Sequence, residues 1–377
     1  MAADPLRVLH VIGAMDRGGA ETLIMNLYRH IDRSKIQFDF LVNDSNPCDY
    51  DEEIIDLGGT IHMIPRYRIA NFPAYLKATS SFFKSHFYPI VHGHIALPAP
   101  IYLSQAHKTG AFLIAHSHAQ KSPLSAPELA FRLSTFPTRY CADYYLGCSE
   151  QAGLDLFGPK IARSERFHVL MNGIDITAAR FSQDSRMSIR NELNLHDSTP
   201  VFGHVGRLTH IKNQTFLLRV FSYILKEMPN AHLLLTGRGE DEEALKNKVR
   251  ELDIENRVHF LGVRSDIPAI MSATDVFVFP SFKEGLANAT IEAQASGARC
   301  LLSTGVPVLA RISPATVFEP LSSGPEEWAK LAIKQYENRS SNRPSAVEGA
   351  RESGFDIDDS AAWLSELYLR NAGNAVA

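Results

Sequence analysis

The sequence predicts an α/β protein built from two doubly wound parallel sheets. Short apolar runs alternate with amphipathic stretches, the alternation pauses over residues 172–190, and the pattern then starts again. Alternation of this kind is typical of parallel strands covered by helices on both faces. The length of 377 residues allows two domains of ordinary size. We therefore expect a domain boundary near residue 180.

The first half contains seven apolar runs, which predict the strands of one sheet. A glycine-bearing turn and a helix over 21–31 follow the first strand, and Leu23, Leu27 and Ile31 fall on one face of that helix. The strands are expected at 7–12, 38–42, 60–64, 90–92, 112–115, 144–147 and 167–170.

The second half repeats the alternation with five strands and four helices. After residue 317 the pattern weakens, 338–351 is polar, and a final helix is expected near 358–370. The strands are expected at 201–205, 232–236, 258–261, 276–279 and 300–302, and the helices at 213–228, 241–252, 265–273 and 287–296.

Composition excludes several classes of protein. The chain has 38 Lys and Arg against 42 Asp and Glu, whereas nucleic-acid-binding domains are usually basic, so no nucleic-acid partner is expected. Its four cysteines form no C-x-x-C pair, which fits a reducing compartment. No window reaches the roughly 18 apolar residues of a membrane span, and the start lacks a signal-peptide pattern. A cytoplasmic protein is expected.

Two cations stand at the edge of the second predicted sheet where ligands bind, beyond the carboxyl ends of the strands. Arg207 lies two residues past one strand, and Lys212 lies just before a helix. A further helix, expected from Ala287, offers free N–H groups and a partial positive charge at its N-terminus. Together these groups suit a diphosphate. The alternatives are that each cation is a solvated surface charge and that the glycines here only end strands.

Glu284 and Glu292 stand with seven residues between them, the first just before this helix and the second inside it. Carboxylates accept hydrogen bonds from hydroxyl groups, so the two could hold a hexose and a ribose. A glycosidase acid/base pair fits less well, because Glu292 lies about one and a half turns into the helix. A third interpretation makes Glu284 a helix-terminal charge and Glu292 an exposed carboxylate.

The glycine pair Gly18-Gly19 follows the first strand. The turn is neither a Walker A loop nor a G-x-G-x-x-G turn. Glycines there would nevertheless let backbone amides approach an anion at the start of the next helix.

Histidines gather in the first half, where ten of the 15 lie before residue 190. His92 and His94 end one predicted strand, and His116 and His118 end another. A zinc cluster is conceivable, but without carboxylates at ligand spacing these side chains are expected to be hydrogen-bonding groups. No metal site is predicted.

These motifs, in this order, resemble glycosyltransferase family 4 over nearly the whole chain. Glu284 and Glu292 look like its E-x7-E motif, and Gly18-Gly19-Ala20-Glu21 looks like its N-terminal glycine loop. Further matches are Gly206-Arg207, Lys212-Asn213, 233–237, 258–262, 280–285 and the interdomain Asn172-Gly173-Ile174-Asp175. The runs 114–118 and 291–295 are most similar to bacterial exopolysaccharide and capsule enzymes.

The resemblance implies a GT-B fold, in which two Rossmann-like domains face each other across a cleft and the final helix crosses back to the first domain. An acceptor-binding domain is then expected over 1–180 with helix 358–377, and a nucleotide-sugar domain over 181–357. The implied activity is retaining, metal-independent transfer of a hexose to a glycan or lipid-linked acceptor in cell-surface polysaccharide synthesis. The donor is a nucleotide-diphosphate sugar, UDP rather than GDP, and no cofactor is expected.

The resemblance also implies site roles by position. Arg207 and Lys212 would hold the diphosphate, Glu292 the ribose and Glu284 the hydroxyls of the sugar. His118 matches the active-site histidine, with His116 as the alternate because the register is ambiguous by two residues. Other donor contacts are expected from Gly206, Gly237, Val263, Gly285, Leu286, Ala287 and Asn288, and Gly18 and Gly19 would border the phosphate and acceptor. Leu286-Ala287-Asn288-Ala289 departs from many relatives, which carry a proline or glycine soon after the Glu-Gly pair.

Two other functions stay open: a GT-B UDP-sugar epimerase, and an inactive GT-B subunit that binds or regulates a partner transferase. Residues 1–190 carry 19 Lys and Arg and 18 Asp and Glu, a balance that would suit association with the inner membrane surface. Phe82, Phe83, Phe87 and Tyr88 either pack in the core or contact the bilayer.

Overall fold

The computed structural model describes residues 4–118, 125–340, 343 and 346–373. It divides into an N-terminal unit, Met1–Gly173 with Ile357–Ala377, and a C-terminal unit, Ile174–Asp356. The boundary falls before the expected position at 180/181, because Ile174 pairs with the end of the C-terminal unit. Its N–H donates to the Phe355 oxygen at 2.8 Å, and it forms a parallel bridge with Asp356.

The N-terminal unit holds a seven-stranded, fully parallel sheet in the order β3-β2-β1-β4-β5-β6-β7. Neighbouring side chains of β1 enter opposite cores, Val8 on one face and Leu9 on the other. The strands are β1 Leu6–Val11, β2 Ile36–Val42, β3 Ile61–Met63, β4 Ile90–Gly93, β5 Phe112–Ser117, β6 Tyr144–Gly147 and β7 Phe167–Val169. The helices are α1 Gly19–His30, α2 Asp51–Asp56, α3 Phe72–Ser85, α4 Ala99–His107, α5 Ala126–Thr135, α6 Glu150–Phe157, α7 Pro159–Ala162 and α15 Ile357–Ala372, with 3-10 turns η1 Ile69–Asn71 and η2 Phe136–Tyr140.

The C-terminal unit holds a six-stranded, fully parallel sheet in the order β10-β9-β8-β11-β12-β13. The strands are β8 Val201–Val205, β9 His232–Thr236, β10 Val258–Gly262, β11 Val276–Phe279, β12 Arg299–Ser303 and β13 Thr316–Glu319. The helices are α8 Gln183–Glu192, α9 Gln214–Glu227, α10 Glu242–Glu251, α11 Ile267–Ala273, α12 Asn288–Ala295, α13 Gly324–Glu337 and α14 Val347–Glu352, with 3-10 turns η3 His210–Lys212, η4 Glu255–Arg257, η5 Val308–Ala310 and η6 Leu321–Ser323. The two sheets confirm the predicted fold class.

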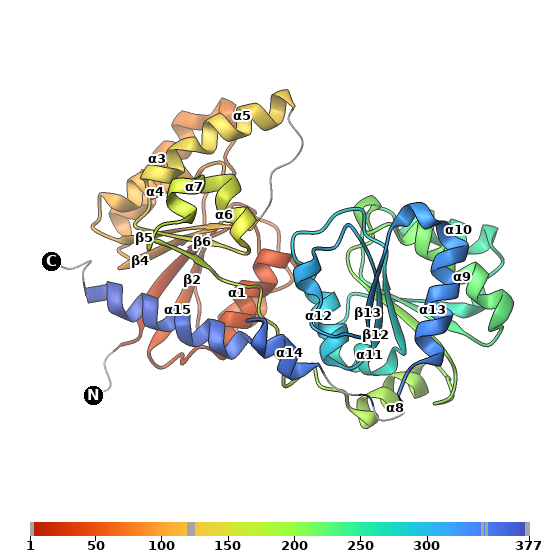
Figure 1. The fold of residues 1–377 in the computed structure, drawn as a ribbon. Helices are drawn as coiled ribbons and strands as arrows, with labels where there is room; N and C mark the ends of the chain where they lie inside the picture. Colours follow the sequence, from red (N-terminus) through yellow and green to blue (C-terminus); the bar gives the residue numbers. More distant parts are fainter. Residues whose placement is uncertain (1–3, 119–124, 341–342, 344–345, 374–377) are drawn as a thin grey trace. The chain divides into compact units, whose positions relative to one another are not determined.

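The final helix, α15, returns to the N-terminal unit, as the resemblance implied. It packs beside α1, β1 and β4 (Figure 1). The Tyr368 hydroxyl lies 2.6 Å from Nδ1 of the buried His92, and Asp358 at the start of the helix lies 2.7 Å from Nδ1 of His30. Leu364 and Leu367 are part of the same core as β1. The helix therefore completes the first sheet's covering layer.

Two segments that lacked a clear sequence pattern contain helices. The buried face of α8 carries one apolar side chain, Ile189, beside two arginines, and Arg186 and Arg190 both pair with Asp275 at 2.9 Å, just before β11. Apolar periodicity therefore missed this helix. Similarly, α14 occupies part of the polar segment 338–351, of which residues 341–342 and 344–345 lie outside the described residues.

Three of the four aromatic side chains considered for a bilayer are core residues. Phe82, Phe83 and Tyr88 are at most 8% exposed, whereas Phe87 is 54% exposed. Within the described ranges, no helix combines the length and apolar character needed to cross a bilayer.

Candidate active site

Backbone hydrogen bonds join the loops that follow β8, β9 and β10. Gly206 N–H donates to Thr236 O at 3.0 Å, and Gly237 N–H donates to Gly262 O at 2.8 Å. Gly237 has a φ of +132°, and a Cβ there would lie 2.1 Å from the Gly206 oxygen. Glycine is needed at this close approach. Val263, directly after Gly262, is 41% exposed, so these predicted site residues share one edge of the sheet.

Lys212 and Glu284 form an ion pair near the end of β11. Nζ of Lys212 is 2.8 Å from both carboxylate oxygens of Glu284 and 4.9 Å from the centroid of the Phe279 ring. The two side chains are only 21% and 10% exposed, so solvent screens their attraction less than it would at the surface. The ammonium predicted to hold a diphosphate is thus engaged by the carboxylate predicted to hold a sugar.

The turn that carries Lys212 is fixed to the loop after β11. This 3-10 turn, η3, ends at Asn213, which has the left-handed φ of 57° and ψ of 40° that asparagine tolerates. Asn213 Nδ2 donates to Pro280 O at 3.2 Å, and Phe282 N–H donates to Ile211 O at 2.9 Å. The loop on each side of the ion pair is therefore held by hydrogen bonds.

Arg207 has an anchored backbone and an available side chain. Its carbonyl accepts a hydrogen bond from Gln214 Nε2 at 2.9 Å, and the same nitrogen lies 3.1 Å from Nε2 of the buried His204. The Arg207 side chain is exposed and has no ion pair or hydrogen bond within the described part of the chain. A bound anion could therefore take this guanidinium without breaking an existing contact.

The start of α12 presents backbone N–H groups, since the first turn of any helix lacks intrahelical acceptors. Ala287 caps it and accepts hydrogen bonds from the N–H and Oγ1 of Thr290, at 2.8 and 2.7 Å. Asn288 Oδ1 is buried without a hydrogen-bond partner among the described residues. Leu286 is half-buried, and Gly285 is exposed, with no atom within 4 Å of the place where a Cβ would lie. A ligand therefore has room beside Gly285.

Glu292 differs from Glu284 in that none of the described residues provides its carboxylate with a cation. It is half-buried on α12, and its carboxylate has no hydrogen bond or ion pair within the ranges that the structure describes. Burial raises its pKa to about 7. An unpartnered carboxylate of this kind is suited to accept hydrogen bonds from a ligand's hydroxyl groups.

The N-terminal unit contains a cavity of about 650 Å³ near the carboxyl ends of β1, β4 and β5. Its walls include Ile12, Glu21, His94, His116, His118 and Phe136. Gly18 and Gly19 are not among the residues that line this cavity, and their expected place beside the phosphate and acceptor stays a prediction. The Glu21 side chain lies beside Gly18, where an added Cβ would be 2.3 Å from its Oε2, whereas no atom lies within 4 Å of the Cβ position of Gly19.

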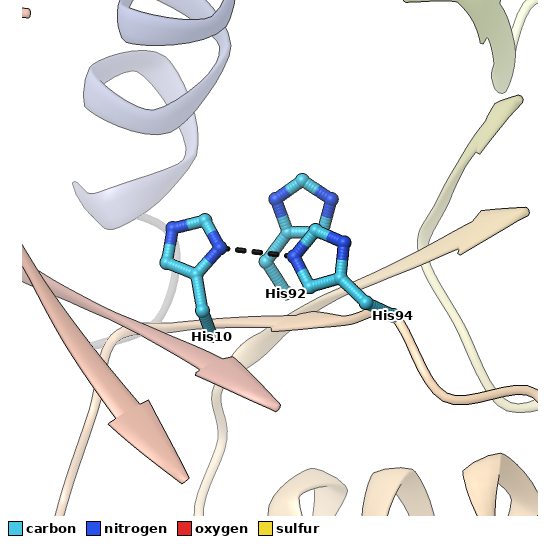
Figure 2. A group of neighbouring side chains, drawn as sticks. All are labelled: His10, His92 and His94. Atoms are coloured by element: carbon cyan, nitrogen blue, oxygen red, sulfur yellow. Dashed lines mark hydrogen bonds between the residues drawn. The ribbon is translucent and has the colours of Figure 1, made fainter. Parts of the chain in front are cut away.

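Five imidazoles stack at the carboxyl ends of these strands. His10 Nδ1 is 2.9 Å from His94 Nε2, and His94 Nδ1 is 2.8 Å from His118 Nε2. Figure 2 shows the His10–His94 hydrogen bond, with the His92 ring beside it. The ring of His116 lies 4.0 Å from that of His118, centroid to centroid. Burial lowers the pKa of His10 to about 3 and that of His118 to about 4, so these two rings are neutral at pH 7.

Both histidines of the ambiguous pair line the cavity. His116 is 3% exposed, and neither of its ring nitrogens has a partner among the described residues. His118 is half-buried and bonded to His94. The greater exposure favours His118 as the group that meets a ligand, while His116 lies deeper.

The comparisons with known proteins cover the whole chain. Residues 17–178 match the domain described as Glycosyltransferase Family 4, and residues 185–343 match Glycosyl transferases group 1. A Bacillus subtilis (strain 168) protein described as a glycosyltransferase, EpsF, is 31% identical over 383 aligned residues, which cover 98% of this chain and 97% of that protein. The chain belongs to glycosyltransferase family 4.

A further relative and two solved structures are also similar to this chain. An Escherichia coli UDP-Gal:alpha-D-GlcNAc-diphosphoundecaprenol alpha-1,3-galactosyltransferase is 33% identical over 141 residues, 37% of this chain and 36% of that enzyme. The crystal structure of Anabaena HepE in complex with UDP-glucose has a TM-score of 0.78 at 18% identity, covering 97% and 100% of the two chains. That of the lipopolysaccharide glycosyltransferase WaaG has a TM-score of 0.72 at 14% identity, covering 96% and 99%. The predicted GT-B fold is confirmed.

Two features of this family 4 chain had not been predicted. The sequence placed Lys212 and Glu284 in separate roles, and only the folded chain shows that they pair with each other. The link from His10 through His94 to His118 was also missed, although H-x-H at the ends of two strands, 92–94 and 116–118, could have signalled it. Parallel neighbours bring such strand ends together, and β4 and β5 pair directly.

Proposed function

We propose that this glycosyltransferase moves a hexose from a UDP-hexose to a lipid-linked glycan acceptor during synthesis of a cell-surface polysaccharide. The observation that carries the donor assignment is the joint placement of Arg207 and the Lys212–Glu284 pair at the carboxyl edge of the second sheet. The relative from E. coli is named for a UDP-galactose donor and a diphosphoundecaprenol acceptor, and HepE was solved with UDP-glucose. Both names support a UDP donor.

In the proposed reaction, the bond between the anomeric carbon and the diphosphate breaks. The acceptor hydroxyl forms the new bond on the same face, through an oxocarbenium-like ion pair, and its proton passes to the leaving diphosphate. Arg207, Lys212 and the N–H groups at the start of α12 stabilise the negative charge that develops on UDP. Because these groups neutralise the diphosphate, no metal ion is required there. Glu292 would hold the ribose hydroxyls.

The Lys212–Glu284 pair suits the donor site both when it is empty and when a donor is bound. Without donor, each charge compensates the other across 2.8 Å. When the diphosphate approaches, the ammonium gains a second anionic partner, and the carboxylate becomes available to accept hydrogen bonds from the sugar. In the N-terminal unit, His118 on the cavity wall would contact the ligand of that cavity.

The acceptor assignment rests on the cavity of the N-terminal unit. Apolar side chains from α5 and η2 line this cavity together with the histidines. Two of these apolar side chains, Leu133 and Phe136, are 68% and 47% exposed. Exposed apolar side chains beside polar groups suit an amphipathic ligand. Such a surface would also favour contact with the inner face of a membrane, where a lipid-linked acceptor lies.

The test uses purified chain with UDP-glucose, UDP-galactose, UDP-N-acetylglucosamine and GDP-mannose, and a lipid-diphosphate sugar as acceptor. We expect acceptor-dependent release of UDP from one UDP-sugar, and a turnover about tenfold or more lower in Arg207→Ala. Arg219→Ala is the matched control, because Arg219 is an exposed arginine on α9. Interconversion of UDP-sugars without acceptor would instead identify an epimerase, and failure to bind any donor would indicate an inactive subunit.

A further inference from the structure

Several ring nitrogens of the histidine cluster are buried and have no hydrogen-bond partner among the described residues. Among the described residues, His10 Nε2, His92 Nε2, His118 Nδ1 and both ring nitrogens of His116 are buried and lack partners. A buried polar atom without a partner costs free energy. Water or a metal ion can supply a missing partner, and neutral imidazoles bind transition-metal ions through a ring nitrogen.

Two sets of three histidines in the described ranges have ring nitrogens within 4.8 Å of one another: His10, His92 and His94, and His94, His116 and His118. They share His94 but differ in access. His10 and His92 are at most 1% exposed, so an ion bound there would be closed off from solvent. All three members of the second set line the 650 Å³ cavity. An ion there has an entry path and an open coordination position filled by water.

We propose that His94, His116 and His118 form a binding site for a first-row transition metal ion such as Zn²⁺. Three imidazoles and a water molecule are a preferred ligand set for zinc, whereas Mg²⁺ and Ca²⁺ prefer oxygen ligands. The sequence argued against a zinc site because no carboxylate stands at ligand spacing, but three histidines suffice without one.

An ion at this site would replace one hydrogen bond of the cluster and keep another. Ligand nitrogens around a tetrahedral zinc ion lie roughly 3.3 Å apart, and His94 Nδ1 is 2.8 Å from His118 Nε2. The ion would replace that hydrogen bond. With Nδ1 of His94 on the metal, its Nε2 carries the proton and donates to His10 Nδ1, at 2.9 Å. An outer partner of this kind fixes the tautomer and orientation of a ligand histidine.

The site has a consequence for the transferase that rests on the proposed function. His118 is the histidine proposed to contact the ligand of this cavity, so the ion and that ligand would compete for it. Zn²⁺ is therefore an inhibitor of sugar transfer, separate from the metal-free chemistry at the diphosphate. Binding of the ion itself needs neither donor nor acceptor, so it stands or falls independently of the proposed function.

Equilibrium dialysis of the metal-free full chain against Zn²⁺, followed by metal analysis, tests the proposal. We expect one Zn²⁺ per chain, and Co²⁺ in its place gives the intense visible bands of tetrahedral coordination. His116→Asn should weaken binding by about a hundredfold or more, beyond the loss of an outer partner. His92→Asn, which removes only the inner set, should retain the ion, as should His107→Asn at an exposed position.

Each outcome decides the assignment. Loss of binding in His92→Asn with retention in His116→Asn would move the ion to the inner set and overturn the proposal. Absence of stoichiometric Zn²⁺ in the wild-type chain would also overturn it. His118→Asn, at the more exposed ligand, serves if His116→Asn does not fold by circular dichroism. Zn²⁺ bound without inhibition of transfer would leave the metal site intact and refute only the assignment of His118 to the ligand of this cavity.

Discussion

Nζ of Lys212 lies equidistant from the two carboxylate oxygens of Glu284, at 2.8 Å from each. The pair brings together the 3-10 turn η3 and the loop before α12, two segments that are 72 residues apart in sequence. It therefore couples the group proposed to bind phosphate with the group proposed to bind sugar. Truncating one partner leaves the other half-buried and uncompensated.

A double-mutant cycle tests this coupling. Lys212→Ala should weaken UDP binding by about tenfold or more, since it removes a cation and leaves a carboxylate facing the diphosphate. Lys212→Ala with Glu284→Gln should recover part of the UDP affinity but not the rate of transfer. Isothermal titration calorimetry measures the first quantity and a turnover assay the second. Strictly additive losses in the double variant would contradict the coupling.

The raised pKa of Glu292 predicts a pH-dependent trade between stability and binding. In the native chain its carboxyl group keeps a proton up to about pH 7, while the unfolded chain loses it near the ordinary value. Folding stability from this group is therefore full below pH 4.5 and is lost as the pH rises through 7. Glu292→Gln should raise the Tm at pH 8 by roughly 2–4 °C, the shift for about 1 kcal/mol.

The same variant should bind a UDP-sugar more weakly at pH 8, because an ionised carboxylate accepts hydrogen bonds from ribose better than an amide does. Wild-type affinity for the UDP-sugar should rise between pH 6 and pH 8, while that of the variant stays flat. Calorimetry across this range with an intact UDP-sugar checks both. Parallel pH profiles for the two proteins would contradict the ribose assignment.

Alanine substitution of two glycines at the second sheet's edge should have different effects, one on stability and the other on donor binding. In Gly237→Ala, a new Cβ would lie 2.1 Å from the Gly206 oxygen at a φ of +132°, so we expect a loss of about 1–3 kcal/mol in the free energy of unfolding. Gly285→Ala meets no atom within 4 Å and should keep the wild-type Tm. Its donor affinity should fall several-fold, because the methyl group takes up ligand space. Denaturant unfolding and UDP titration separate the two effects.

A substitution in the cavity of the N-terminal unit should change acceptor binding and leave donor binding unchanged. Leu133→Ser should raise the acceptor KM by about tenfold, the value of one buried leucine side chain, and leave the KM for the UDP-sugar unchanged. Leu369→Ser is the matched control: it is 46% exposed on α15 and is not a lining residue. A rise in both KM values in Leu133→Ser would point to a general loss of structure.

Most strands and helices were predictable because apolar periodicity reports the faces that pack. β6, β8, β9 and β11 begin and end at the residues that the sequence indicated. β13, Thr316–Glu319, was missed because it lies where the apolar pattern weakens, at residue 317. α8 was missed because two of its buried side chains are arginines, Arg186 and Arg190, which weakens its apolar periodicity.

The sequence indicated which residues belong to the site, but it did not indicate which of them contact one another. Residues at strand ends, such as Arg207 and His118, could be assigned to the ligand edges because strand order fixes where they emerge. The pairing of Lys212 with Glu284 could not, since it depends on how a 3-10 turn and a loop of the same sheet edge approach each other. The sequence also did not show that the Glu21 side chain lies beside Gly18.

The return of α15 to the first sheet has a consequence for biosynthesis. The N-terminal unit obtains Leu364, Leu367 and Tyr368 for its core only after the entire C-terminal unit has been translated. During synthesis one apolar face of the first sheet therefore stays partly uncovered until α15 has been made. The second sheet can fold as soon as its own residues leave the ribosome. The later half of the polypeptide is thus expected to mature first, and removal of α15 to harm the half made earliest.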